Sequence, residues 1–171
     1  CIFTSGSTSK PKGVLLSHTN IINNCIDFTK HFEYDSQTIT LSWLPHYHAF
    51  GLLMGLYFPL FSSTPVYIMP TKIFVNSPLS WIENAAKYKA THLAAPDFGY
   101  MLCAKQIENG AKRDWDLSQV KYSFSASEPV QKESFERFSS ALKKYGLKKE
   151  VLSGMYGMSE ASVISCQSNK E

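Results

Sequence analysis

The chain has 171 residues, of which 44% are hydrophobic and 18% charged, and this balance is typical of a globular protein rather than a disordered one. The net charge is +3 and the basic residues are scattered, so the charge pattern does not indicate nucleic-acid binding. The longest uncharged apolar run, 49–61, is shorter than the roughly 20 residues of a membrane-spanning helix, so we expect no transmembrane segment.

The four cysteines, Cys1, Cys25, Cys103 and Cys166, form no CxxC pair and none of the dense frameworks of disulfide-rich secreted domains. This spacing favours reduced thiols, and we expect a cytoplasmic protein. The chain begins without Met on a short apolar segment, so we expect a fragment. Residues 1–171 are then one partial domain.

The first half of the chain alternates between helical and strand patterns. Ser17 is a suitable N-cap for a helix with one apolar face. That face is formed by Ile21, Ile22, Cys25, Ile26 and Phe32. A strand is expected at 38–44 and a mostly apolar helix at 47–61. The continuous apolar run at 65–69 is typical of a strand buried on both faces.

The same alternation continues after residue 70. Residues 78–88 fit a helix with Glu83 and Lys87 paired on its outer side. A strand at 91–95 leads into a helix that Asp97 is expected to cap.

The last third of the chain completes the pattern. Residues 120–125 alternate with the period of two of a strand, and a final strand is expected from about residue 151. The clearest helix is 131–145, which ends at Gly146 as its C-cap. Five repeated βα units predict an α/β fold with a mainly parallel sheet and helices on both faces. Ligands in such folds bind beyond the carboxyl ends of the strands.

The first motif that carries chemistry is TSGSTSKPKG at 4–13. Its glycines and small hydroxylated residues allow backbone N–H groups and hydroxyls to converge on phosphate oxygens, and Lys10 and Lys12 add positive charge. It is not a Walker A loop, because Pro11 stands where that motif requires glycine. The alternative is a flexible turn. The candidate phosphate-binding residues are Thr4, Ser5, Gly6, Ser7, Thr8, Lys12 and Gly13.

Four later segments follow expected strands: WLPHYHAFGL at 43–52, APDFGY at 95–100, SASEPV at 125–130 and YGMSEA at 156–161. Together with the first loop they resemble the motifs of the adenylate-forming superfamily, and they are most similar to those of fatty acyl-AMP ligases. The resemblance covers nearly the whole chain. It implies a fragment of the large N-terminal, AMP-binding domain, with the C-terminal domain absent.

The resemblance also implies roles for individual residues, with His48, Glu160 and Lys12 as candidate catalytic residues. His48 is expected near the acyl carboxylate, where an imidazole donates to developing negative charge. Thr4 and Glu160 are expected to hold Mg²⁺. The expected acyl-binding residues are His48, Phe50, Gly51, Pro96 and Phe98. The expected adenine-binding residues are Ala126, Ser127, Glu128, Tyr156, Gly157, Met158 and Ser159.

Several of these residues also allow a structural role. His48 could cap a helix, Glu128 could make a structural hydrogen bond, and the apolar residues 50–61 could serve core packing alone. His46 and His48 have the spacing of a metal-binding pair, but no further cluster of metal ligands lies nearby in the sequence.

The function implied by the resemblance is ATP-dependent activation of a fatty acid to fatty acyl-adenylate, with release of pyrophosphate. ATP and Mg²⁺ are the implied cofactors, and an acyl carrier protein or polyketide synthase is the implied acyl acceptor. The alternatives are a long-chain acyl-CoA synthetase and a non-catalytic module that binds nucleotide or acyl groups. The motif for the ribose hydroxyls, the hinge and the C-terminal lysine of the family are missing from these residues, so we expect this piece to be inactive alone.

Overall fold

The computed structural model describes residues 1–3, 12–110, 113–161 and 166–167. Within these residues, six strands form one sheet in the order β4-β3-β5-β6-β7-β8. The parallel strands are β3 (Thr40–Ser42), β4 (Val66–Ile68), β5 (His92–Ala95), β6 (Tyr122–Ser125) and β7 (Leu152–Tyr156). The antiparallel strand is β8 (Cys166–Gln167), which pairs with β7. A separate antiparallel pair is formed by β1 (Ile2–Phe3) and β2 (Gly13–Val14).

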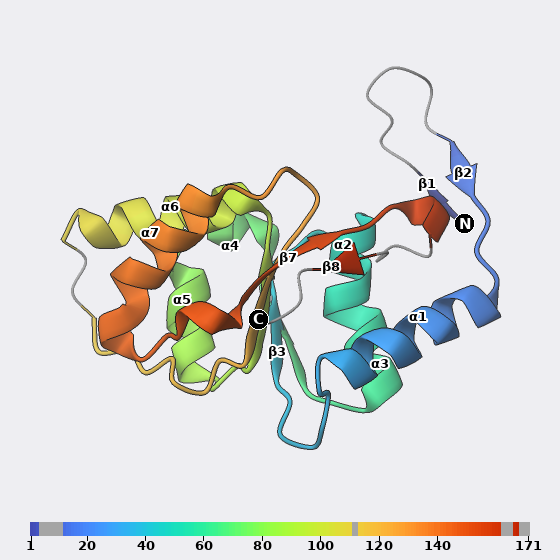
Figure 1. Cartoon of the computed structure of the whole chain (residues 1–171), viewed down its shortest axis with the longest axis horizontal. Coiled ribbons are helices and arrows are strands. Elements are labelled where there is room, and N and C mark those ends of the chain that lie inside the picture. Colours follow the sequence, from blue (N-terminus) through green and yellow to red (C-terminus); the bar gives the residue numbers. More distant parts are fainter. Residues whose placement is uncertain (4–11, 111–112, 162–165, 168–171) are drawn as a thin grey trace.

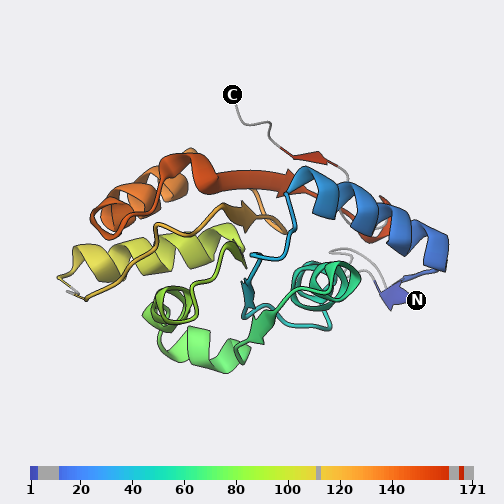
Figure 2. The same ribbon diagram turned by 90° about the horizontal axis from the view of Figure 1, so that it is seen from below.

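Helices lie on both faces of this sheet (Figures 1 and 2). One face carries α1 (His18–His31), α2 (Ala49–Leu52) and α3 (Phe58–Ser62). The other face carries α4 (Thr71–Asn76), α5 (Leu79–Lys87), α6 (Asp97–Glu108) and α7 (Lys132–Leu142). Parallel strands require such crossovers, because each connection must return the chain to the same end of the sheet. The predicted fold class is therefore confirmed.

Helix α1 begins where the sequence predicts. The Ser17 hydroxyl oxygen accepts a hydrogen bond from the Asn20 amide (3.1 Å), and the Asn20 side-chain oxygen accepts one from the Ser17 amide (3.0 Å). This reciprocal cap satisfies two backbone donors at the helix start. The apolar face differs from the prediction, because Ile22 and Ile26 are exposed whereas Phe28 is buried. The ring of Phe28 buries more apolar area than either isoleucine, so the helix turns that side to the core.

The helix predicted at 47–61 is one helical segment in which a π-helical turn (Leu53–Tyr57) joins α2 to α3. The sequence prediction missed this turn, and Pro59 explains it. Proline has no N–H to bond the carbonyl of Gly55, and its ring clashes with that carbonyl in a regular α-helix. The amide of the preceding residue bonds the carbonyl five residues back instead, which widens the turn.

Strand β4 is not buried on both faces, contrary to the expectation for 65–69. Tyr67 and Ile68 are 39% and 47% exposed. Among the described strands β4 pairs with β3 alone, so it lies at an edge of the sheet. An apolar sequence cannot by itself distinguish an edge strand from a central one.

Three further local expectations differ from the structure. The predicted pairing of Glu83 with Lys87 is wrong, because the Glu83 carboxylate accepts a hydrogen bond from Arg113 (3.0 Å) instead. The period of two at 120–125 does not separate a buried face from an exposed one. All four residues of β6 are buried, its serines included, since helices cover both faces of the sheet. Helix α4 was absent from the sequence prediction.

Asp97 is not the N-cap of α6, which is Pro96. Its buried carboxylate binds the start of α7 instead, accepting hydrogen bonds from the amide of Gln131 (2.9 Å) and the hydroxyl of Ser134 (2.7 Å). At its far end α7 continues as a 3-10 turn (Lys143–Tyr145) to a left-handed glycine, as predicted for Gly146 (φ 86°). Two further 3-10 turns lie at Lys149–Val151 and Ser159–Ala161.

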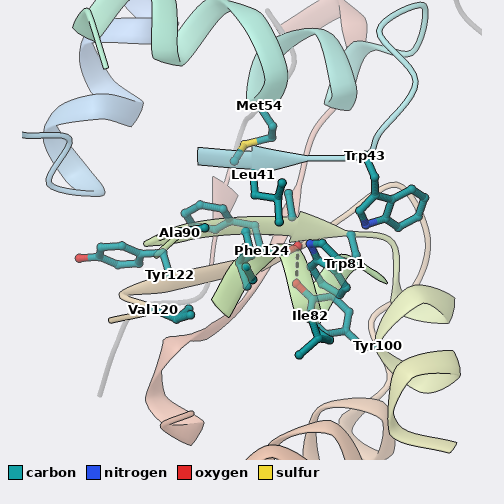
Figure 3. Packing of buried hydrophobic residues seen from close by; sticks show 14 of the residues in the cluster. Leu41, Trp43, Met54, Trp81, Ile82, Ala90, Tyr100, Val120, Tyr122 and Phe124 are labelled. Carbon is teal, nitrogen blue, oxygen red and sulfur yellow. Dashed lines mark hydrogen bonds between the residues drawn. The ribbon is translucent and has the colours of Figure 1, made fainter. Parts of the chain in front are cut away.

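The core fills the space between the sheet and its helices with aromatic side chains (Figure 3). The fully buried Trp81, Tyr100 and Phe124 lie in its centre. The Tyr100 hydroxyl donates to the carbonyl oxygen of Phe124 (2.7 Å), which fixes α6 on β6 (Figure 3). Burial raises the pKa of this hydroxyl, so it stays protonated as the donor. In the described residues, no helix has the length and apolar character needed to cross a membrane.

Candidate active site

The motif segments lie at the carboxyl ends of neighbouring strands. The sheet register pairs Leu41 with Leu93, and Ala95 with Ser125, which in turn pairs with Gly154. The segments that follow β3, β5, β6 and β7 therefore leave the same end of the sheet. This is the end at which parallel α/β sheets bind ligands.

His48 is the N-cap of α2. Its Nδ1 accepts a hydrogen bond from the amide of Phe50 (3.2 Å), so the neutral ring carries its proton on Nε2. The side chain is exposed, and this Nε2–H is a donor directed away from the helix end. Capping and donation to a substrate are thus compatible roles of one imidazole.

The start of α2 lies unusually close to the turn before it. A Cβ atom on Gly51 would be 2.2 Å from the carbonyl oxygen of Pro45, so only glycine fits. The ring of Phe50 is buried in the core. Farther along, Gly55 lies against the ring of His46, whose Nε2 is buried without a hydrogen bond in the described part of the chain.

An aromatic cluster connects the ends of β3 and β5. Trp43 stacks on Phe74 with ring centroids 3.7 Å apart, and the ring of Phe98 meets Trp43 edge-on at 6.1 Å. Phe98 is 46% exposed, and Pro96 is partly buried beside it. The structure therefore brings the exposed ring of Phe98 into contact with Trp43, which begins the segment 43–52 that holds His48.

The turn after β6, Ala126–Val130, carries three of the expected adenine-binding residues. Ala126 is buried, and Ser127 has a left-handed backbone (φ 77°). Glu128 Oε1 accepts a hydrogen bond from the amide of Phe98 (2.8 Å). Of the two roles that the sequence allows for Glu128, the structure therefore contains the structural hydrogen bond.

The end of β7 lies beside this turn. Gly154 lies under the side chain of Val130, and two residues later Tyr156 is 57% exposed. Gly157 and Met158 are also exposed, and Ser159 begins the following 3-10 turn. Tyr156 is thus exposed two residues beyond the glycine that contacts the Ala126–Val130 turn, and its residue type is one that stacks on planar ligands.

The expected phosphate and metal residues are only partly described. Thr4, Ser5, Gly6, Ser7 and Thr8 lie outside the described residues. Lys12 and Gly13 are exposed at the start of β2, and the exposed Glu160 follows β7. In both views β1, β2 and the segment after β7 lie at the same end of the molecule (Figures 1 and 2).

Comparison with known proteins decides the family. A sequence model of the AMP-binding enzyme family matches residues 1–171. The chain belongs to this family. Over 162 residues it is 35% identical to a medium-chain-fatty-acid–acyl-carrier-protein ligase of Moorena producens and 37% identical to one of Teredinibacter turnerae. These matches cover 95% of this chain but 27% and 25% of the relatives, so the chain spans about a quarter of their length.

Solved structures of AMP-binding enzymes have the same fold. A fatty acyl-adenylate ligase from Legionella pneumophila, in complex with acyl adenylate and pyrophosphate, matches with a TM-score of 0.92 and 36% identity. The match covers 98% of this chain and 30% of that chain. Five parallel strands with flanking helices are therefore part of the N-terminal adenylation domain of this family.

The AMP-binding family implies a Mg²⁺ ion, and the described residues are compatible with one. Among them, no group of three or more His, Cys, Asp or Glu side chains is suited to hold a metal. Mg²⁺ needs no such cluster, because one or two protein oxygens suffice when phosphates and water complete its shell. The exposed carboxylate of Glu160 fits that requirement.

Sequence reasoning missed two groups that shape this site. Asp97 was treated as a local cap, although its carboxylate reaches another helix. Phe74 comes from a helix that was not predicted, yet it supports the ring of Trp43. Their spacing in the sequence, 37 residues from Asp97 to Ser134 and 31 from Trp43 to Phe74, gives no local signal.

Proposed function

We propose that the whole protein activates a fatty acid to fatty acyl-adenylate at the expense of ATP, releasing pyrophosphate. The observation that carries this proposal is the arrangement of His48, Phe98 and Tyr156 on segments that leave the same end of one sheet. One segment offers a hydrogen-bond donor, one an exposed apolar ring, and one an exposed ring for stacking. The relatives named as fatty-acid ligases support the choice of substrate.

In the proposed reaction a carboxylate oxygen of the fatty acid attacks the α-phosphorus of ATP. A new phosphorus–oxygen bond forms, and the bond from that phosphorus to the bridging oxygen breaks, so that pyrophosphate leaves with its electron pair. The carboxylate is ionised at pH 7 and needs no base. The protein has to hold two anions together and offset the charge that spreads over the phosphates.

Different residues of this chain carry out the separate parts of this task. The Nε2–H of His48 donates to the reacting carboxylate and phosphate oxygens. Residues 4–8, Lys12 and Gly13 bind the β- and γ-phosphates, and the adenine lies between Tyr156 and the Ala126–Val130 turn. Mg²⁺, held by Thr4 and Glu160, would supply positive charge to the triphosphate.

The acyl acceptor is proposed from the relatives. Two of them are named as acyl-carrier-protein ligases, and we propose a carrier protein or a polyketide synthase for this protein too. A long-chain acyl-CoA synthetase is the alternative. A structural neighbour described as a long-chain-fatty-acid-CoA ligase is 21% identical and supports the fold alone. A cytoplasmic location remains a prediction from the cysteine spacing, with Cys25 and Cys103 buried as free thiols.

The test uses the whole protein with α-labelled ATP, Mg²⁺ and a medium-chain fatty acid, with and without CoA. Labelled acyl-AMP that accumulates and survives CoA is the expected result. Conversion of the label to free AMP with formation of acyl-CoA would assign the protein to the synthetase alternative. The absence of labelled adenylate across a series of acids would contradict the proposal and favour a non-catalytic binding module.

A further inference from the structure

Two carboxylates bind the segments after β5 and β6 to one another in opposite directions. Glu128, in the turn after β6, accepts a hydrogen bond from the amide of Phe98 in the first turn of α6 (2.8 Å). Asp97, the first residue of α6, accepts hydrogen bonds from the amide of Gln131 (2.9 Å) and the hydroxyl of Ser134 (2.7 Å) at the start of α7. We call this pair of contacts the carboxylate clasp.

The clasp replaces caps that both helices lack. The N-cap of α6 is Pro96, whose side chain has no acceptor, and the N-cap of α7 is Gln131, whose side chain makes no capping bond. Backbone donors at a helix start need an acceptor, and a carboxylate also interacts favourably with the helix dipole. Each helix therefore obtains its acceptor from the other segment, so neither start can shift without disturbing its neighbour.

The clasp also holds an unusual backbone. Ser127, immediately before Glu128, has a φ of 77°, a conformation that costs free energy in any residue with a Cβ atom. Such a conformation persists only where the surrounding contacts determine it. The bond from Glu128 to α6 is a contact of that kind, since it fixes the turn one residue beyond the strained position.

We infer that Asp97 and Glu128 are positioning residues that couple the adenine turn (Ala126–Val130) to the acyl segment (95–100). This inference rests on the function proposed above for these two segments. Through the clasp, nucleotide bound at the turn orders the start of α6, where Pro96 and Phe98 meet the acyl group. The nucleotide thereby fixes the fatty acid in the geometry that the attack requires.

The test measures amide hydrogen exchange of the whole protein with and without AMP. In the parent protein AMP is expected to slow exchange both in 125–131 and in 97–100. In Glu128→Ala, AMP is expected to slow exchange in 125–131 as before, whereas its slowing of exchange in 97–100 becomes much weaker, because only the Asp97 contacts then connect the two segments. Glu128 is exposed, so this variant is expected to fold.

Two further variants separate positioning from charge. Glu128→Gln keeps an acceptor oxygen and is expected to retain the slowed exchange in 97–100. Glu133→Ala removes a carboxylate from the first turn of α7 that pairs with Arg137 at the surface, and it is expected to behave as the parent protein. In adenylate formation, Glu128→Ala should lower kcat, with a smaller change in the KM for ATP.

The outcomes separate the clasp from the proposed function. If AMP slows exchange in 125–131 but not in 97–100 of the parent protein, the inferred coupling through the clasp is overturned, and nucleotide binding is not. Slowing of exchange in 97–100 by AMP that is as strong in Glu128→Ala as in the parent protein would overturn the coupling as well. If AMP slows exchange in neither segment, nucleotide binding at the turn is contradicted, and so is the coupling that depends on it.

Discussion

At the residue scale, His48 has a structural role as the cap of α2, and we propose a chemical role for the same ring. Its Nδ1 caps α2, and this bond determines which nitrogen carries the proton. The sequence presents these roles as alternatives. The geometry makes the first a condition for the second, because a ring that accepts through Nδ1 must donate through Nε2.

Substituting His48 can separate the two roles. His48→Asn keeps an acceptor for the α2 amides but loses the Nε2 donor, whereas His48→Ala loses both. Turnover in adenylate formation should fall by roughly 10²–10³ in both variants, as for loss of one preorganised donor. The free energy of unfolding should fall only in His48→Ala, by about 1 kcal/mol. Near-normal turnover of His48→Asn would restrict His48 to capping.

Glu160 offers a second test at the same scale. Glu160→Gln keeps the size and the exposed position of the side chain but removes its charge. Because a neutral amide is a much weaker ligand for Mg²⁺, we expect turnover of the whole protein to fall by roughly 10²–10³. Steady-state assays at saturating ATP measure this. A loss of less than about fivefold would remove Glu160 from the mechanism.

At the scale of elements, the site depends on how closely the segment from α2 to α3 approaches β3. Gly51 lies against the backbone of Pro45, and Gly55 against the ring of His46. The π-helical turn between them follows from Pro59. These three small or rigid residues set the direction of the helix that His48 begins.

Gly51→Ala tests this approach. The added Cβ would lie 2.2 Å from a carbonyl oxygen, so the backbone must shift, and the free energy of unfolding should fall by roughly 1–3 kcal/mol or more. The matched control is Gly154→Ala, whose Cβ would meet Val130 at an ordinary 3.7 Å. Chemical denaturation of both variants gives the comparison. Equal stabilities would mean that the helix can move away at little cost.

At the scale of the whole molecule, the two ends of the sheet differ in chemistry. The carboxyl end carries the exposed side chains of the candidate site, whereas the amino end contains the fully buried His92. Its Nε2–H donates to the carbonyl oxygen of Phe32 (2.9 Å), and its Nδ1 lies 2.9 Å from the hydroxyl of Thr91. This ring links α1 to β5 far from the candidate site.

Because His92 is buried, we expect the free energy of unfolding of the protein to depend on pH. Burial lowers its pKa from 6.5 to about 4, although the hydrogen bond to Phe32 opposes the shift. Between these values the unfolded chain binds a proton that the folded chain does not. The contribution of neutral His92 is therefore complete above pH 6.5 and is lost progressively as the pH falls from 6.5 to 4, by about 3 kcal/mol in total.

Urea denaturation between pH 7 and pH 4 measures this dependence. The control is His92→Gln, which keeps a donor for the Phe32 carbonyl but does not titrate. Its free energy of unfolding should change less over this range than that of the parent protein. Parallel curves for the two proteins would show that His92 does not control the acid sensitivity.

The sequence by itself determined the α/β class, the cap of α1, the left-handed Gly146 that ends the 3-10 turn after α7, and the order of the motifs. These follow from local rules: hydrophobic period, capping chemistry and residue spacing within a few positions. The same local rules predicted that the motifs at 43–52, 95–100, 125–130 and 156–161 lie at the ends of strands, and in the structure they do.

The tertiary structure alone decided what depends on neighbours distant in the sequence. It determined that β4 is an edge strand, that Ile22 and Ile26 face outward, and that Glu83 pairs with Arg113. It also turned Asp97 from a local cap into one half of a clasp between α6 and α7. A side chain's residue type fixes what it can bind, but packing fixes which distant group it meets.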